Sequence, residues 1–239
     1  MGLLMSHESV KEIIEKARNE KRGKLLEHEA YEVLRAYGLP VPKAGLAKNA
    51  DEAAELAESI GYPVVLKIVS PDIVHKSDVG GVILNLNNKE EVREAFNKII
   101  SNVKEKAPKA SITGVLVQEM VPEGLEVIVG ATRDPTFGPV LLFGLGGIFV
   151  EVLKDVSFRI APVTRYDAET MLTEIRAAKL LEGYRGMPPR DKEAIIDIIM
   201  KLSKFMEEQE HVTDVDLNPI MVYEKGKGAK IADARVLIK

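Results

Sequence analysis

The sequence contains no cysteine, and it has only two glutamines. Without cysteine, disulfide bonds and thiolate metal sites are excluded. No apolar run approaches the roughly 20 residues that cross a bilayer, and the opening MGLLMSHESV lacks the basic and long apolar stretches of a secretory signal. These absences predict a cytoplasmic protein that does not enter a membrane. The scarcity of glutamine beside many Lys and Glu residues is typical of proteins from hot environments.

Two common nucleotide-binding motifs are also missing. No GxxxxGK[ST] phosphate loop occurs. In GLGGIF, residues 144–149, Phe149 stands where the dinucleotide fingerprint requires its third glycine. A Walker-type or Rossmann-type site is therefore not expected.

What is present is an ordinary globular composition. The chain has 239 residues, of which 46% are hydrophobic and 29% charged, enough for one large domain or two small ones. Its formal net charge of −4 argues against a general nucleic-acid-binding surface. No internal repeat or low-complexity segment is visible.

The first part of the chain predicts helices that feed a sheet. Ser9 and Glu12 are spaced like a capping box before a helical apolar repeat. Another helix is expected to begin at Asn49 and to end at Gly61. The strands expected here are residues 62–69 and 81–86, and a helix follows the Asn87-Asn88 turn.

The second part is richer in strands. Strands are expected at 114–121, 125–132, 139–143 and 156–163, and helices at 167–181 and 189–208. Near the end, VTDVDLNPIMVY and AKIADARVLI flank KGKG, which predicts a hairpin. The pattern indicates an α/β (α+β) protein with two lobes and a cleft between them. The predicted parts are a helical segment at 1–23, a first lobe at 24–113 and a second lobe at 114–239.

A lysine, a histidine and a glycine pair follow one another around the first predicted hairpin. Alternation places Val64, Leu66 and Ile68 on one strand face and Lys67 on the other. Lys67 then either ends in solvent or faces an anion. Gly80-Gly81 either let backbone N–H groups approach phosphate oxygens or simply form a turn. His75, on the loop, is either a solvent-exposed side chain or a nucleophile.

Two carboxylates and an arginine occur on the next predicted strands. Glu119 is the polar member of an otherwise apolar strand face, so it lies either at an exposed strand end or in a site where the Glu119–Val121 backbone lines an adenine slot. In that second case Glu126 reaches the ribose. Arg133 would offer paired donors to phosphate, or lie beside a turn in solvent.

The acidic end of the chain predicts a metal site. Alternation in TDVDLNPI places Asp214, Asp216 and Asn218 on one face, and IADARV adds Asp233. Like charges this close repel one another unless a cation neutralises them. Oxygen ligands without His or Cys suit Mg²⁺ that is shared with substrate phosphates. A solvated acidic face is the alternative.

Several long motifs, in this order, resemble the ATP-grasp fold. More narrowly, the chain is similar to the beta (nucleotide-binding) subunits of ADP-forming acetyl-CoA synthetases, and to the corresponding part of succinyl-CoA synthetase. The resemblance extends over residues 24 to 239. Its motifs are LKIVSPDIVHKSDVGGV, LVQEMVPEGLEVIVGATRDPTFGPVLLFGLGGIFVE, VDLNPI and IADAR.

The resemblance implies a role for each candidate residue. Nucleotide-binding residues would be Lys67, Gly80, Gly81, Glu119, Met120, Val121, Glu126 and Arg133. Mg²⁺ ligands would be Asn218 and Asp233. His75 matches a second phosphorylated histidine of the acetyl-CoA type, and Asp216 matches a carboxylate that steadies the incoming phosphohistidine.

The implied reaction needs a second subunit. A CoA-binding alpha subunit would form an acyl phosphate and phosphorylate its own histidine, and His75 would pass the phosphoryl group to ADP. The resemblance implies an α2β2 assembly, with the CoA and acyl sites on the partner. Two rival hypotheses are a stand-alone ATP-grasp ligase that joins a carboxylate to an amine and a non-catalytic subunit that senses ATP and ADP.

Overall fold

The computed structural model describes residues 7–73, 75–147 and 153–239, which form two compact units. The small unit comprises Leu26–Tyr31 and Pro42–Met120. The large unit comprises the chain up to Leu25, Glu32–Val41 and Val121–Lys239. The last four residues of the long motif that ends FGLGGIFVE, which include Phe149, lie outside the described residues.

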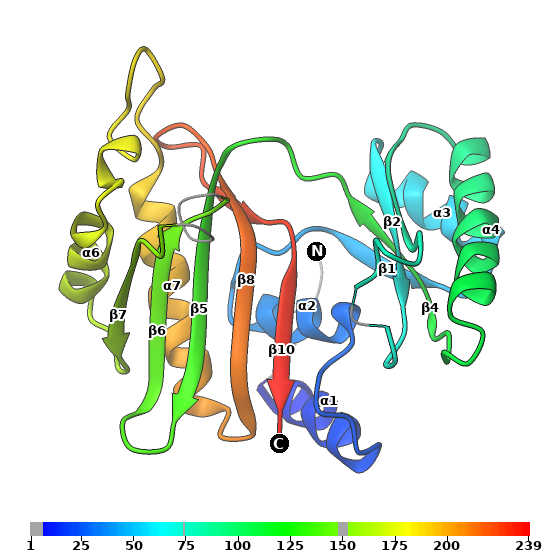
Figure 1. The fold of residues 1–239 in the computed structure, drawn as a ribbon, viewed down its shortest axis with the longest axis horizontal. Helices are drawn as coiled ribbons and strands as arrows, with labels where there is room; N and C mark the ends of the chain where they lie inside the picture. Colours follow the sequence, from blue (N-terminus) through cyan, green and yellow to red (C-terminus); the bar gives the residue numbers. More distant parts are fainter. Residues whose placement is uncertain (1–6, 74, 148–152) are drawn as a thin grey trace. The chain divides into compact units, whose positions relative to one another are not determined.

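The small unit is built on a four-stranded sheet in the order β1-β4-β2-β3, in which every pairing is antiparallel (Figure 1). Its elements are β1 (Ala44–Ala47), α3 (Ala50–Ile60), β2 (Val64–Val69), β3 (Val82–Leu86), α4 (Lys89–Lys106) and β4 (Gly114–Glu119). The helices α3 and α4 begin where the sequence indicates. Asn49 and Asn88 cap them, with side-chain oxygens that accept backbone N–H groups of the first turn.

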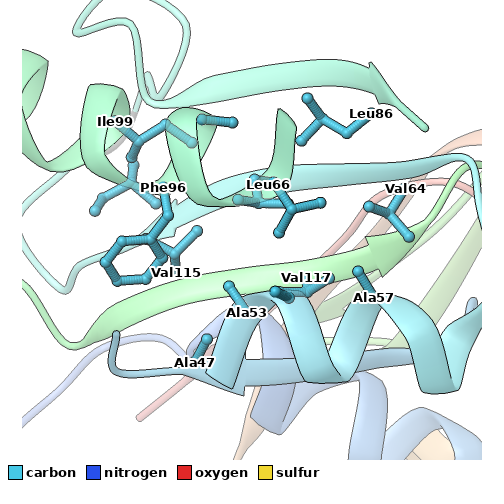
Figure 2. Close-up of a cluster of buried hydrophobic side chains, with 14 of the residues drawn as sticks. Ala47, Ala53, Ala57, Val64, Leu66, Leu86, Phe96, Ile99, Val115 and Val117 are labelled. Carbon is cyan, nitrogen blue, oxygen red and sulfur yellow. The ribbon is translucent and has the colours of Figure 1, made fainter. Parts of the chain in front are cut away.

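One face of this sheet forms the core of the small unit. Figure 2 shows Leu66 and Val64 on β2 packed beside Val117 on β4 and residues of both helices. Leu66 and Phe96 are almost fully buried, and burying a side chain of this size contributes about 1.5–3 kcal/mol. The predicted alternation of β2 is therefore correct, and Lys67 lies on the opposite face from this core.

The division between the two units differs from the predicted boundary at residue 113. Strand β4 pairs with β1 and with β2, so residues 114–119 belong to the small unit. The chain leaves that unit only after Met120. The sequence pattern does not show this pairing, because the apolar pattern of a strand is the same whether its partners precede or follow it in the sequence. The division also falls within α2 (Glu27–Ala36), which local sequence patterns do not reveal.

The large unit contains an antiparallel sheet in the order β10-β8-β5-β6-β7, with β9 paired to β8 (Figure 1). Its strands are β5 (Leu125–Asp134), β6 (Gly138–Leu145), β7 (Val156–Ile160), β8 (Val212–Val222), β9 (Ala229–Ile231) and β10 (Ala234–Ile238). Its helical elements are α1 (His7–Asn19), α6 (Arg165–Glu174), the 3-10 helix η1 (Ala178–Leu180) and α7 (Lys192–Glu208). The predicted hairpin around KGKG is confirmed by the β8–β9 pairing.

The helix predicted at 167–181 is interrupted. Asp155 is buried, and its carboxylate accepts the N–H groups of Arg176 and Ala177 at 2.8 and 2.9 Å. These donors are thereby removed from the helical ladder, and Ile175 adopts an extended conformation. A carboxylate that is distant in the sequence thus ends α6, and no local sequence pattern predicts this contact.

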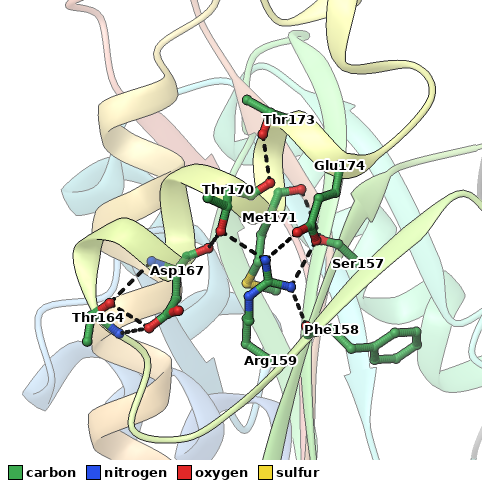
Figure 3. A network of polar contacts seen from close by, with 9 residues as sticks. All are labelled: Ser157, Phe158, Arg159, Thr164, Asp167, Thr170, Met171, Thr173 and Glu174. Carbon is green, nitrogen blue, oxygen red and sulfur yellow. Dashed lines mark hydrogen bonds and ion pairs between the residues drawn. The ribbon is translucent and has the colours of Figure 1, made fainter.

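The ends of α6 are fixed by polar contacts with its neighbours (Figure 3). Thr164 and Asp167 form a reciprocal capping box at its start. Arg159 on β7 donates to Glu174 at 2.5 and 2.9 Å and to Thr170 at 2.9 Å. These contacts hold α6 on the edge strand of the large sheet.

The capping box expected at Ser9 and Glu12 is absent. The described part of α1 begins at His7, so Ser9 already lies inside the helix and cannot cap it. Among the helices that the structure describes, none is long and apolar enough to cross a membrane.

Candidate active site

A single buried carboxylate holds two lysines in the small unit. Glu27 Oε1 accepts from Lys67 Nζ at 2.7 Å, and Glu27 Oε2 forms an ion pair with Lys76 Nζ. The side chains of Glu27 and Lys67 are only 5% and 11% exposed. We call Glu27, Lys67 and Lys76 the Glu27 cluster. Its formal charge is +1, so it suits the approach of an anion.

Two further groups support the Glu27 carboxylate. The Tyr31 hydroxyl lies 3.0 Å from Glu27 Oε1 and 3.0 Å from the Gln118 side-chain oxygen. Tyr31 and Gln118 are 1% and 2% exposed. The alternative in which Lys67 ends in solvent is therefore wrong, because the side chain turns inward to a buried network.

The loop that carries His75 is fastened on both sides. Before it, Asp72 accepts the N–H of Ser111 at 2.7 Å. After it, Gly81 donates to the carbonyl of Lys76 at 2.8 Å and accepts from the N–H of Ile68 at 2.7 Å. His75 itself is exposed, in the position that an accessible nucleophile requires.

The glycine pair is explained by packing and turn geometry. A Cβ on Gly81 would lie 2.4 Å from Ile68 and 2.9 Å from the carbonyl of Lys76. Gly80 has φ +65°, and its N–H donates to Ser77 at 3.0 Å. Both backbone donors are thus engaged within the loop, which favours the turn alternative over a phosphate cradle.

The segment from Glu119 to Val121 has most of its donors engaged. The Glu119 carboxylate accepts the N–H of Lys43 at 2.9 Å, and the Glu119 N–H donates to the Lys43 carbonyl at 2.9 Å. The N–H of Met120 donates to Pro63 at 3.1 Å. The Glu119 side chain therefore binds the backbone of Lys43 at the end of β4, and an adenine contact would have to come from the remaining backbone groups.

In the large unit, β8 has the two faces that the sequence predicts. Val215 and Leu217 are buried, whereas Asp214 and Asp216 are half-buried and Asn218 is exposed. We call Asp214, Asp216 and Asn218 the acidic face. Thr132 on β5 donates to Asp214 at 2.8 Å, which places Thr132 on the same side of the sheet.

Asp216 occupies the middle of this face. Its neighbours in register are Gly130 on β5 and Arg235 on β10. Burial raises the pKa of the Asp216 carboxyl above its ordinary value, and the charge of Arg235 offsets part of that rise. A carboxyl in this setting gains from a nearby cation or from a hydrogen-bond donor such as an imidazole.

The backbones of Asn218 and Asp233, the two residues of the metal prediction, lie side by side. The Asn218 N–H donates to the Asp233 carbonyl at 3.2 Å, across the start of β10. Among the described residues, no three carboxylate or His side chains cluster tightly enough to hold a metal alone. Two oxygen donors suit a Mg²⁺ ion that takes its other ligands from water and nucleotide phosphates. The residues present therefore fit that cation.

Glu126 lies at the same end of the large sheet as Asn218. It pairs with Met221, three residues beyond Asn218 on β8. Gly146 packs on Glu126, to which its N–H donates at 2.8 Å, and a Cβ on Gly146 would come within 2.8 Å of Glu126. The absence of a side chain at Gly146 therefore allows its backbone to lie close to Glu126.

Arg133 has a different role from the one predicted. Its guanidinium donates to the carbonyls of Met206, Gln209 and Val212 at 2.5, 3.2 and 3.1 Å, at the end of α7 and the start of β8. It lies seven residues from Glu126, about 23 Å along an extended strand. Alternation also puts Arg133 on the helix-covered face. We therefore do not include Arg133 in the candidate site.

Sequence reasoning missed Glu27 and Lys76. Glu27 and Tyr31 are four residues apart, so they share one face of α2, and that face adjoins the buried apolar residues of the helix. The spacing indicates a polar pair at the edge of a buried face. It does not indicate that the partner is Lys67, which is 40 residues further along the chain.

Comparisons with known proteins identify relatives that match nearly the whole chain. The family described as "ATP-grasp domain" matches residues 16–238. The beta subunit of ADP-forming acetate–CoA ligase II of Pyrococcus furiosus is 49% identical over 236 residues, covering 98% of this chain and 100% of the relative. The ligase I beta subunit of that organism is 51% identical, with 95% and 97% covered. The ADP-forming 4-hydroxybutyrate–CoA ligase of Nitrosopumilus maritimus is 50% identical, and this chain spans 32% of its length.

Solved structures of acetyl-coenzyme A synthetase 1 from Ca. Korarchaeum cryptofilum are similar in fold. One, in complex with coenzyme A and Ca-AMPCP, has a TM-score of 0.92 and 51% identity, covering 96% of this chain and 99% of that chain. Another, with a phosphorylated phosphohistidine segment, has a TM-score of 0.91 and 48% identity, with 96% and 100% covered. The chain belongs to the ATP-grasp family and, within it, to the beta subunits of ADP-forming acetate–CoA ligases.

Proposed function

We propose that this chain is the nucleotide-binding subunit of an ADP-forming acyl-CoA synthetase and that His75 carries the phosphoryl group to ADP. The observation that carries the proposal is the position of His75: it is exposed, on a fastened loop, and directly precedes a lysine of the Glu27 cluster. The relatives with a phosphohistidine segment match this chain over nearly its whole length. We propose acetyl-CoA as the substrate, because acetate and acetyl-coenzyme A are named for these relatives.

The chemistry of the proposed step follows from the imidazole. A ring nitrogen of His75 attacks the phosphorus of the partner's phosphohistidine, and a new P–N bond forms as the partner's P–N bond breaks. The proton that the His75 ring loses passes to the imidazole of the partner. A β-phosphate oxygen of ADP then attacks the phosphorus, and a P–O bond forms as the P–N bond breaks. The electron pair stays on the ring nitrogen, and one proton returns the ring to neutral imidazole. The step is reversible, so ATP can also phosphorylate His75.

The small unit supplies a cation for this step. Lys67 offers its ammonium group to the oxygens of the nucleotide and of the phosphoryl group, where charge-assisted hydrogen bonds are strong. The exposed loop lets the imidazole meet its two reaction partners in turn, and correct positioning supplies much of the rate in phosphoryl transfer.

The large unit supplies oxygen donors. Asn218 and Asp233 would hold Mg²⁺ together with the nucleotide phosphates, and the ion would neutralise phosphate charge. Asp216 accepts a hydrogen bond from the imidazole of the incoming phosphohistidine and so orients the ring. Glu126 and the remaining backbone groups of Glu119–Val121 hold the ribose and adenine.

In this proposal, the CoA and acyl sites belong to an alpha subunit. The two subunits form an α2β2 assembly in the cytoplasm of an organism from a hot environment. The subunit names of the Pyrococcus furiosus relatives support such a partner. The acyl group is set by that partner.

A coupled assay tests the proposal. With the alpha subunit, acetyl-CoA, phosphate, ADP and Mg²⁺, the wild-type chain should form ATP, and His75→Asn should reduce the rate to background. ATP formation at the wild-type rate by His75→Asn would favour a nucleotide-sensing subunit. Turnover of ATP with a carboxylate and an amine, without the partner, would favour a stand-alone ligase.

A further inference from the structure

In the small unit, the Glu27 carboxylate links a candidate phosphate ligand to the segment that carries His75. Glu27 Oε1 binds Lys67, a candidate phosphate ligand, and Oε2 binds Lys76, the residue directly after His75. Consecutive Cα atoms are about 3.8 Å apart, so a contact that holds Lys76 also limits how far the backbone of His75 can move. The start of α2 therefore fastens the histidine segment to the strand that carries Lys67.

We infer that Glu27 is a positioning residue for the phosphoryl transfer: through Lys76 it fastens the His75 segment beside Lys67, in the position from which His75 exchanges its phosphoryl group with the nucleotide. This inference rests on the proposed function. It adds a residue that acts through the segment and touches neither the nucleotide nor the imidazole.

Burial makes this anchor effective. The Glu27 side chain is 5% exposed and that of Lys76 is 24% exposed, whereas ion pairs at the surface of the small unit, such as Lys89–Glu58, are 39% and 50% exposed. Charge pairs interact more strongly when water is excluded from them. Surface pairs contribute little by comparison.

The backbone of the segment is anchored independently of the Lys76 side chain. The Lys76 carbonyl accepts from Gly81, and the Gly81 carbonyl accepts from Ile68 on β2. Lys76 is thus held to β2 through its backbone and to α2 through its side chain. Removing the side-chain contact should release the His75 side of the turn while Gly81 stays on the sheet.

The proposed relay gives such an anchor a direction, because His75 meets the partner's phosphohistidine in one half-reaction and the nucleotide in the other. In this chain, an anchor on the same carboxylate as Lys67 favours the nucleotide-side position. Weakening it should slow the nucleotide half-reaction and leave the partner half-reaction unchanged.

The test compares the two half-reactions in Lys76→Met, Glu27→Gln and the double variant. The nucleotide half-reaction is the rate at which γ-labelled ATP and Mg²⁺ label His75 in the full chain. The partner half-reaction is labelling of His75 in the complex with the alpha subunit, from acetyl-CoA and labelled phosphate without ADP. Lys89→Met is the matched control, and Lys76→Arg is the conservative variant.

Lys76→Met should slow the nucleotide half-reaction by about tenfold or more, the effect of losing one charge-assisted hydrogen bond. The partner half-reaction, the ATP affinity and the melting temperature should stay close to those of Lys89→Met. The double variant should be no slower than the slower single variant, since both changes remove one contact. Lys76→Arg should restore the rate.

Other outcomes overturn the inference. If both single variants are labelled at the wild-type rate, Glu27 has no role in the transfer. If both half-reactions slow equally, the contact between Glu27 and Lys76 contributes only to stability. Additive effects in the double variant would mean that Lys76 and Glu27 act independently. If the wild-type chain is not labelled, or His75→Asn is labelled equally, the proposed function itself fails, and the inference fails with it.

Discussion

The Glu27 cluster and the acidic face handle charge in opposite ways. In the small unit, two lysines share one buried carboxylate, so the cations exceed the anion by one. In the large unit, Asp214 and Asp216 share one face of β8, with Arg235 opposite Asp216 on the neighbouring strand. The first arrangement is closed and hydrogen-bonded from several sides, whereas the second is partly open to solvent.

The difference indicates what each arrangement binds. Ammonium groups held by a carboxylate are positioned in advance and can turn to phosphate oxygens without new desolvation. Carboxylates on an open face suit a hydrated cation, which keeps part of its water shell. The small unit therefore carries cations that suit phosphate oxygens, and the large unit carries oxygen groups that suit a cation.

Removing Glu27 is expected to have the largest effect on stability. Glu27→Ala leaves the buried Lys67 ammonium without its carboxylate, which costs about 3–5 kcal/mol in the free energy of unfolding. Denaturant titration measures the change. Glu58→Ala, which breaks the exposed pair with Lys89, is the control and should leave the midpoint unchanged. Equal midpoints for the two variants would contradict a buried, closed cluster.

Lys67→Ala tests the cationic half of the comparison. The variant should lose about 1.5–3 kcal/mol of nucleotide binding free energy, the contribution of a charge-assisted hydrogen bond to phosphate. Calorimetry with ADP and Mg²⁺ gives the affinity. Wild-type affinity would mean that Lys67 serves the Glu27 cluster alone.

Asp233→Ala tests the oxygen-ligand half. Removing a group that only orients a metal ligand lowers metal affinity by about 10–100-fold. Removing the ligand itself should therefore weaken Mg-nucleotide binding by about tenfold or more. The effect should appear with Mg-ADP and shrink when ADP is titrated without Mg²⁺. The same loss with and without Mg²⁺ would place Asp233 outside the metal site.

Asp216→Asn should have the smallest effect, and one that depends on pH. Because the folded state raises the pKa of Asp216, the carboxyl binds more protons when folded, and its contribution lowers stability as the pH rises through the raised value. The variant should therefore be more stable than the wild type near neutral pH. The gain should vanish below the ordinary carboxyl range. Thermal unfolding between pH 3 and 7 measures it, and a variant less stable than the wild type near neutral pH would contradict the burial of this carboxyl.

Much of the fold could be predicted because its signals are local. The alternation of β2 and β8 fixes which side chains face the core, and both patterns are confirmed. The asparagine caps of α3 and α4 and the glycine-rich hairpin turn are also short-range. The acidic face follows from alternation alone.

The rest depended on contacts between distant residues. Lys67 was placed on the correct face, but its partner Glu27 is 40 residues earlier, and no spacing rule connects them. Arg133 resembles a phosphate ligand in sequence, yet the end of α7 takes its donors. For Gly80-Gly81 the sequence left a phosphate loop and a turn open, and only the contact with Ile68 explains the absence of a side chain at Gly81.

The most direct test of the central claim is the labelling of His75. The chain is incubated with γ-labelled ATP and Mg²⁺, with and without the alpha subunit, and wild type is compared with His75→Asn. The account predicts an acid-labile, base-stable label on the wild-type chain that is absent from the variant. Nucleotide binding without any label on His75, together with full activity of His75→Asn in the complex, would contradict it.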